Sequence, residues 1–354
     1  MKQNSLLLGA AVLMLATACS NDEVVKVAEN SAAIGFNSFV GNATRTDYGT
    51  SKDSELKAFN VYGVTWGTVD PFQVFNGVEV TKKEAQENNS FWSYVTETEK
   101  LRYWIPGNTY SFAAVAPIDA IAAAAADGKA VVTQGTGTTN GGITEIQFTN
   151  NGNVDLLFDA KETPDANAVV NFELKHLLSR VKFQLNNQMG SGIYYIEVKD
   201  VRIKKVVTNA TYTVATPAWT ATDRADFNFA VNYLEGENVM HTAYNASAVS
   251  ESHNLIPEAD AEYDATFTIV LYQYVDGKYT KVHADYVHNV KLPNVGYKAG
   301  YSYLFSADIT PSNIDPQGNE LSPIIFSATV KDFEDDNVSD LPTQKPEIPV
   351  TPAE

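Results

Sequence analysis

Apolar and polar residues alternate along most of this chain with the period-two spacing of β-strands. The clearest segments are 170–174 and 181–185, in which Val, Phe and Leu alternate with polar or charged residues. One apolar face and one polar face are what a half-buried strand requires. Residues 267–275 are apolar on both faces, which predicts a central strand. Asp276-Gly277 follows at once and predicts a tight hairpin.

Turn residues separate many further short segments with strand-like composition. These expected strands are 34–40, 58–64, 101–104, 110–115, 154–160, 195–203, 211–214, 227–231, 279–290, 301–309 and 324–333. We expect 101–104 and 110–115 to pair across the turn at 106–108, and the alanine-rich residues 118–126 to form a short surface helix. Evenly spaced short strands with little helical pattern predict an all-β protein built from sandwiches.

The length of 354 residues fits two domains after a leader is removed. We place an N-terminal β-sandwich at 31–172 and a C-terminal β-sandwich at 173–340, because the period-two pattern changes phase between its two clearest segments. Residues 341–354 carry four prolines and predict an extended, disordered tail.

The first 19 residues have the pattern of a bacterial lipoprotein signal. Lys2 precedes an apolar run at 6–15, small residues follow at 16–18, and Cys19 is the one cysteine of the chain. The run is too short for a retained membrane span, so we expect a signal peptide at 1–18, lipid on Cys19, a tether at 19–30 and an outer-membrane location. The alternative is an ordinary cleaved signal with an incidental cysteine.

Composition and motifs argue against several functions. The net charge of −18 disfavours nucleic acid as a partner. The five histidines lack metal-ligand spacing and no serine-nucleophile motif is present, so we expect no metal, no cofactor and no enzyme activity. We expect His176 to be a structural hydrogen-bonding group, and the acidic residues 332–336 to be a solvated strand end, with calcium binding as the alternative. The tryptophans fit either sandwich cores or a sugar-stacking platform; they are Trp66, Trp92, Trp104 and Trp219.

A series of short motifs in order along the chain resembles the Bacteroidales fimbrillin family, the subunits of type V pili and their accessory surface lipoproteins. The motifs with the strongest resemblance are Phe59-Asn-Val-Tyr-Gly63, Trp104-Ile-Pro-Gly-Asn-Thr-Tyr-Ser-Phe112, Phe172-Glu-Leu-Lys-His-Leu-Leu-Ser-Arg-Val-Lys-Phe183 and Val330-Lys-Asp-Phe333. The resemblance implies two tandem transthyretin-like β-sandwich domains.

The resemblance also implies a mode of assembly. A protease would cut between Arg45 and Thr46, and the strand that carries Ile34, Phe36 and Val40 would leave. The vacated apolar groove would then accept a strand from another pilus subunit by β-augmentation. The alternative for Arg45 is a solvated loop arginine that is never cut.

A donor strand should alternate and avoid proline. The candidate donor is the segment with Ile324, Phe326, Ala328 and Val330, which could equally be the last strand of the second domain. The proline-rich end favours a tip, anchor or accessory subunit over the shaft subunit of a fimbrium, with a host or bacterial surface ligand as a further partner. The alternative function is a monomeric surface lipoprotein that binds glycan.

Overall fold

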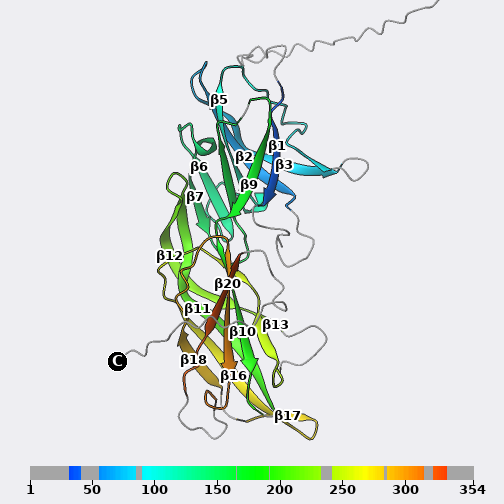
Figure 1. Cartoon of the computed structure of the whole chain (residues 1–354), viewed down its shortest axis with the longest axis vertical. Helices are drawn as coiled ribbons and strands as arrows, with labels where there is room; N and C mark the ends of the chain where they lie inside the picture. The colour runs from blue at the N-terminus through cyan, green and yellow to red at the C-terminus, as the bar shows by residue number, and fades with distance from the viewer. Residues whose placement is uncertain are drawn as a thin grey trace, which may run out of the picture.

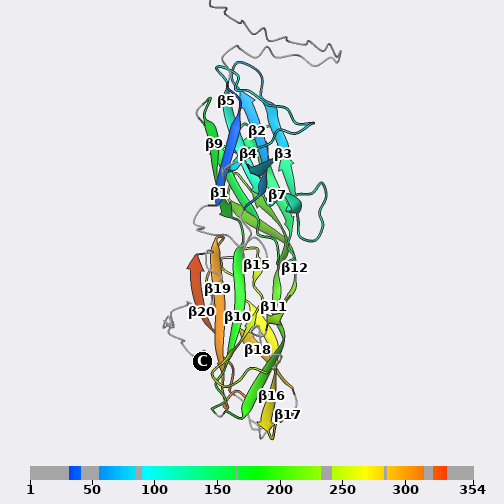
Figure 2. The same cartoon turned by 90° about the vertical axis from the view of Figure 1, so that its right-hand side faces the viewer.

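A computed structural model describes residues 32–40, 56–84, 90–164, 166–190, 192–232, 241–282, 285–314 and 322–332. These residues form strands that are connected by loops, turns and short 3₁₀ turns, so the all-β prediction is confirmed. The molecule is elongated: strands from the first half of the chain lie at one end and most strands from the second half lie at the other (Figures 1 and 2).

The first sheet has the strand order β1-β9-β8-β5-β2-β3-β4. Its strands are β1 (Gly35–Val40), β2 (Ala58–Trp66), β3 (Phe72–Glu84), β4 (Ser90–Ser93), β5 (Thr109–Ala116), β8 (Leu157–Glu162) and β9 (Val169–His176). One face of this sheet encloses an aromatic core that includes Phe59, Phe75, Phe112 and Phe172. We call it the first core.

The second sheet has the order β13-β14-β10-β19-β20, with β15 also paired to β10. Its strands are β10 (Ser179–Asn187), β13 (Val231–Asn232), β14 (Ser247–Ser250), β15 (His253–Leu255), β19 (Tyr301–Ile309) and β20 (Ser327–Asp332). Strands β10, β19 and β20 lie side by side in Figure 2. Their inward residues, such as Phe183 and Phe305, belong to the second core.

The third sheet runs along much of the molecule and is called here the shared sheet. Its order is β17-β16-β11-β7-β6, with β12 on β11 and β18 on β16. Its strands are β6 (Lys129–Gln134), β7 (Ile143–Thr149), β11 (Tyr194–Thr213), β12 (Ala218–Phe229), β16 (Asp264–Val275), β17 (Lys278–Lys281) and β18 (Tyr286–Lys291). The beginning of β11 pairs with β16 and its end pairs with β7, so this 20-residue strand serves both ends of the molecule.

A further apolar cluster lies where the two halves meet. It contains Tyr62 and Val115 of the first sheet together with Phe148, Tyr212 and Ile256. The division into two transthyretin-like sandwiches at residues 172 and 173 stays a prediction. In the observed sheets β9 runs across that position, and strand β11 and the apolar cluster both connect the two halves.

Several local predictions can be compared with the strands. Segments 170–174 and 181–185 lie within β9 and β10, as predicted. The hairpin at Asp276-Gly277 is confirmed, since both residues have positive φ, 51° and 79°, between β16 and β17.

Several local predictions are wrong. The expected strand at 279–290 is two strands, β17 and β18, and the strands expected at 195–203 and 211–214 are parts of the single strand β11. The expected helix at 118–126 is only the 3₁₀ turn η2 (Ile118–Ala120), because a short alanine run without capping groups gains too little from helix propensity alone. Residues 101–104 do not pair with β5. Tyr103 instead bridges to Ala33 at the start of the chain's described part. A second 3₁₀ turn, η3 (Asn140–Gly142), precedes β7.

Candidate functional site

The first strand occupies an edge of the first sheet. Strand β1 pairs in parallel with β9 over six residues, from Gly35 opposite Val169 to Val40 opposite Leu174. No other strand of the described chain lies beyond it in the sheet order. Figures 1 and 2 show β1 in dark blue in the same end of the molecule as the green β9. An edge strand can leave without breaking a ladder on its far side.

The residues that lead into β1 are held by a different part of the chain. The Ile34 amide donates to the Arg102 carbonyl at 2.8 Å, and the Trp104 amide donates to the Ala32 carbonyl at 3.0 Å. Segment 102–104 therefore hydrogen-bonds the residues that immediately precede β1.

The side chains of this segment lie in the first core although the strand lies at an edge. Ile34 is 1% exposed and Phe36 is 5% exposed. The Phe36 ring contacts four aromatic rings whose centroids lie 5.0 to 5.9 Å away, contributed by Phe75, Phe112, Tyr94 and Phe172. Burying each such side chain contributes about 1.5–3 kcal/mol. Removal of β1 would therefore uncover an apolar groove.

Tyr94 and Arg102 form a clamp over the start of the groove. The Tyr94 hydroxyl donates to the Ile34 carbonyl at 3.0 Å and accepts from the Arg102 amide at 3.0 Å. Burial raises the pKa of Tyr94, although the bond from Arg102 opposes the shift, so the hydroxyl stays protonated and can donate. The Arg102 guanidinium lies 4.5 Å from the centre of the Phe75 ring and forms a cation–π pair with it. This pair lies beside the site that Phe36 occupies.

Strand β9, the ladder partner of β1, is itself weakly attached on its other side. Only two residue pairs join β8 to β9, Leu157 with His176 and Phe158 with Lys175. Beyond them the Asp159 carboxylate accepts from the Glu173 amide at 2.7 Å, so a side chain replaces a ladder bond. Residues 169–174 of β9 thus have β1 as their strand partner, and they would lose this backbone pairing if β1 left.

The candidate donor segment is seated in its own chain. Ile324, Phe326 and Ala328 are 3%, 4% and 4% exposed and belong to the second core, whereas Val330 is 45% exposed. Strand β20 pairs antiparallel with β19 from Ser327 to Asp332. In this conformation β20 is the last strand of the second sheet.

Several other predicted residues fall outside the described part of the chain. Cys19, Arg45 and Thr46 lie there, as does His283, and Val40 is described only by its backbone. The acidic side chains at 332–336 lie there too. The lipidation, cleavage and calcium hypotheses therefore stay predictions.

Three of the four tryptophans pack in or against cores, and Trp66 is the half-buried last residue of β2. Trp104 is 2% exposed and belongs to the first core, Trp92 packs against that core, and Trp219 packs against the cluster between the two halves. The Trp219 indole donates to the Leu177 carbonyl at 3.0 Å, which supports a packing role. His176 lies 2.9 Å from the Asp155 carboxylate in a buried pair.

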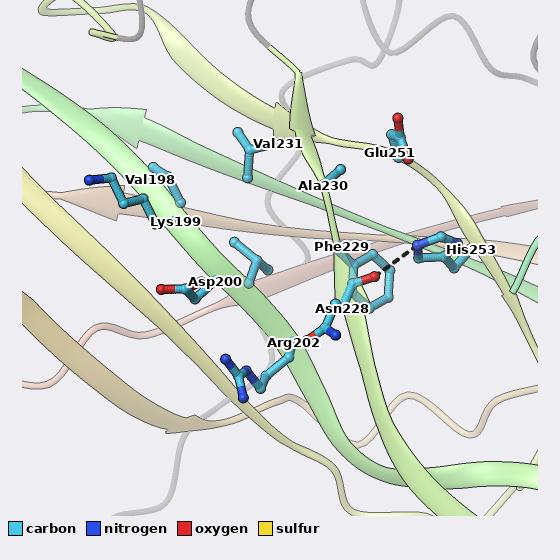
Figure 3. Close-up of a pocket in the computed structure, with 11 residues that line it drawn as sticks. Val198, Lys199, Asp200, Arg202, Asn228, Phe229, Ala230, Val231, Glu251 and His253 are labelled. Carbon is cyan, nitrogen blue, oxygen red and sulfur yellow. Dashed lines mark hydrogen bonds between the residues drawn. The ribbon is translucent and has the colours of Figure 1, made fainter. Parts of the chain in front are cut away.

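One concave region lies on the second half of the molecule, where β11 separates from β12 and β13 (Figure 3). Its volume is about 490 Å³. The lining includes two basic and two acidic side chains, Lys199, Arg202, Asp200 and Glu251. The Nε2 of His253 donates to the Asn228 carbonyl at 2.9 Å. Because the two positive and two negative side chains balance, the charge of this region does not favour any one class of ligand.

Within the described ranges, no group of three or more His, Cys, Asp or Glu side chains is arranged to hold a metal ion. No helix in the same ranges has the length and apolarity needed to cross a membrane.

Comparisons with known proteins agree with the architecture. A family model described as fimbrillin-like matches residues 44–332. A fimbrial protein from Bacteroides vulgatus has a similar fold, with a TM-score of 0.61 and 14% identity over 86% of this chain and 100% of that chain. The fimbrial anchor protein Mfa2 from Porphyromonas gingivalis aligns with a TM-score of 0.35 and 9% identity over 85% of this chain and 97% of that chain. A comparison with curated protein sequences finds no match.

Proposed function

Because this chain belongs to the fimbrillin-like family, we propose that it is a non-enzymatic fimbrial subunit or adhesin that assembles by exchange of its first strand. Family membership supports a role as a pilus subunit or adhesin at the cell surface. The strand exchange is the specific mechanism that we propose for this chain.

The observation that carries the proposal is the position of β1. It is an edge strand, yet Ile34 and Phe36 fill the first core. A cut between Arg45 and Thr46 would separate β1 from the rest of the chain. The groove would then offer the unpaired edge of β9, the aromatic pocket of Phe36 and the Tyr94 hydroxyl to an incoming strand. Backbone bonds would supply affinity and the pocket would supply register.

The candidate donor carries the same side-chain spacing as the strand it would replace. Ile34, Phe36, Ser38 and Val40 stand at alternate positions, and Ile324, Phe326, Ala328 and Val330 repeat that order with a small residue at the third place. Alternate positions point to one face of a strand, so the donor can present Ile and Phe to the two sites that Ile34 and Phe36 occupy. Donation requires β20 to leave β19, which we propose to occur during assembly.

We place the subunit at the tip, at the anchor or in an accessory position rather than in the shaft. One feature supports this position: residues 342–352 carry four prolines, which disfavour a ladder strand. We further propose that lipid on Cys19 attaches the exported chain to the outer membrane before processing.

The proposal can be tested by refilling the groove. The full-length protein, with a site for a specific protease inserted after Arg45, is cut while folded and mixed with a labelled peptide of residues 31–42. The peptide should exchange with the resident strand and bind with 1:1 stoichiometry. A peptide of residues 322–332 should compete with it, and the same peptide with Phe326→Ser should not. Failure of the first peptide to bind the cut protein contradicts a replaceable strand.

A further inference from the structure

Four tyrosines gather on the outer face of the shared sheet, at the end of the molecule opposite to β1. They come from three neighbouring strands: Tyr195 of β11, Tyr272 and Tyr274 of β16, and Tyr279 of β17. The ring centroids of Tyr195 and Tyr279 are 5.0 Å apart, and those of Tyr274 and Tyr279 are 4.6 Å apart. We call these four residues the tyrosine platform. The hairpin of β16 and β17 lies at the lower end in Figure 1.

The register of the strands puts these rings on one face. Tyr195 is opposite Tyr272, and Tyr274 is opposite Tyr279. Directly paired residues and residues two apart share a face. The alternate residues Ile196 and Leu271 are fully buried in the second core. The core is therefore filled from the other face, and the tyrosine platform is not needed to fill it.

His241 completes the aromatic surface. Its ring stacks on Tyr279 with centroids 4.1 Å apart and meets Tyr272 edge-on at 4.2 Å. Desolvation lowers the pKa of His241, so its ring is neutral near pH 7 and extends the platform as an aromatic surface.

Fixed charged groups border these rings. The Glu197 residue is 1% exposed, and its carboxylate accepts from the Tyr272 hydroxyl at 3.0 Å and from the Lys199 ammonium at 3.2 Å. Lys281 pairs with Asp285 on the other side, and the side chains of these two residues are 45% and 44% exposed. The buried Glu197 fixes Tyr272 and Lys199 in place, and Lys199, Lys281 and Asp285 are the charged groups at the edge of the platform that water can reach.

This combination matches the chemistry of a saccharide. A pyranose ring has a flat C–H face that packs on an aromatic ring, and a rim of hydroxyls that needs both donors and acceptors. A stable protein–protein interface buries about 800 Å² of surface on each partner. The platform consists of four tyrosine rings, of which Tyr274 is 39% exposed, and so is a small surface by comparison. Stacked nucleic-acid bases are disfavoured by the net charge of −18.

We propose that the tyrosine platform, with the exposed Lys199, Lys281 and Asp285 at its edge and the buried Glu197 orienting Tyr272 and Lys199, binds a sugar residue of a surface glycan. This site lies away from the groove of β1 and does not depend on strand exchange. It would leave the first strand free to mediate assembly while the opposite end of the molecule contacts a glycan.

The test uses the full-length protein and a printed array of mammalian mucin-type, N-linked and plant oligosaccharides, followed by calorimetry with the oligosaccharide that gives the strongest signal. Replacement of a stacking ring, Tyr274→Ala or Tyr279→Ala, should weaken binding by about tenfold or more. Tyr279→Phe keeps the ring and should retain binding within about threefold. Tyr301→Ala, which removes a tyrosine of similar exposure from the second sheet, is the matched control and should bind as the native chain does.

Melting temperatures decide whether a loss of binding is local. Tyr274 is the most exposed ring of the platform, so Tyr274→Ala should leave the melting temperature unchanged and carries the test even where Tyr279→Ala destabilises the fold. Absence of binding by the native chain to every saccharide on the array overturns the proposal. So does binding that survives Tyr274→Ala undiminished.

Discussion

Strands β1 and β20 are both edge strands, and the segments that contain them, 34–40 and 324–332, each place an Ile and a Phe, two residues apart, in an aromatic core. Their supports differ. Strand β20 lies on β19, which is paired with β10 over eight residues. Strand β1 lies on β9, which is joined to β8 by only two pairs. Strand β20 therefore adds to a pair of strands that is already fully hydrogen-bonded, whereas β1 pairs with a strand that has few other backbone partners.

The difference indicates which strand is built to be replaced. Loss of β20 would open the second core but leave the β10–β19 ladder intact. Loss of β1 would open the first core and also leave the facing part of β9 without a ladder partner. A chain that loses β1 therefore has the larger local need for a new strand, and the segment 324–332 has the same spacing of Ile and Phe as the lost strand.

The largest expected effect comes from Arg45→Ala, which removes the proposed cleavage position. We expect complete loss of incorporation into polymers, seen as loss of the ladder on a non-boiled gel, with no change in melting temperature because the substitution removes only the side chain that the protease would recognise. Lys52→Ala, a second cation in the same stretch of sequence, is the control and should assemble normally. Normal pili from Arg45→Ala would rule out the mechanism.

Substitution of the buried Phe36 and Phe326 should distinguish the released strand from the donor strand. Phe36→Ala and Phe326→Ala should each destabilise the intact monomer by about 3–5 kcal/mol, measured by urea unfolding, because each leaves a cavity among aromatic rings. In isolated polymers the effects should diverge: Phe326→Ala should weaken the polymer in detergent, and Phe36→Ala should leave it unchanged since its strand has gone. Equal weakening by both variants is incompatible with release of β1.

Two adjacent isoleucines just before β20 test how this segment is seated in the second core. Ile324 is 3% exposed and Ile325 is 69% exposed. We expect Ile324→Ala to destabilise the monomer by about 2–5 kcal/mol and Ile325→Ala to change stability by no more than about 0.5 kcal/mol. Similar costs for the two variants would show that β20 is not seated in this register.

The smallest effect concerns the clamp on β1. Tyr94→Phe removes the hydroxyl that bonds the Ile34 carbonyl and should cost about 1 kcal/mol. Hydrogen exchange of the amides at 34–36 should accelerate by roughly fivefold, as this free energy implies, while exchange in β19 stays constant. Unaltered exchange at 34–36 would mean that the clamp does not hold the strand.

Local patterns were sufficient for much of the fold. The strict alternation at 170–174 and 181–185 identified β9 and β10, and Asp276-Gly277 identified the hairpin of β16 and β17. Each signal depends only on residues close in sequence. Strands β6 and β7 were missed because their alternation is weak, and β11 was expected as two strands because Lys204-Lys205 and its bulges interrupt the pattern.

The candidate site was predictable only in part. The alternation of Ile34 and Phe36 indicated a strand with a buried face, and both side chains are buried. The clamp could not be found in the same way, since Tyr94 lies 60 residues from Ile34 in sequence and only the folded chain brings the two together. The tyrosine platform likewise depends on the register between β11, β16 and β17, which no single segment specifies.

The central claim is that β1 is absent from the assembled form. Mass spectrometry of polymers isolated from the cell surface, after digestion with a protease that does not cleave at arginine, tests it directly. The account predicts a first peptide that begins at Thr46 and no peptide that contains residues 34–40. Recovery of residues 34–40 in amounts equal to the rest of the chain, continuous with Thr46, would contradict it.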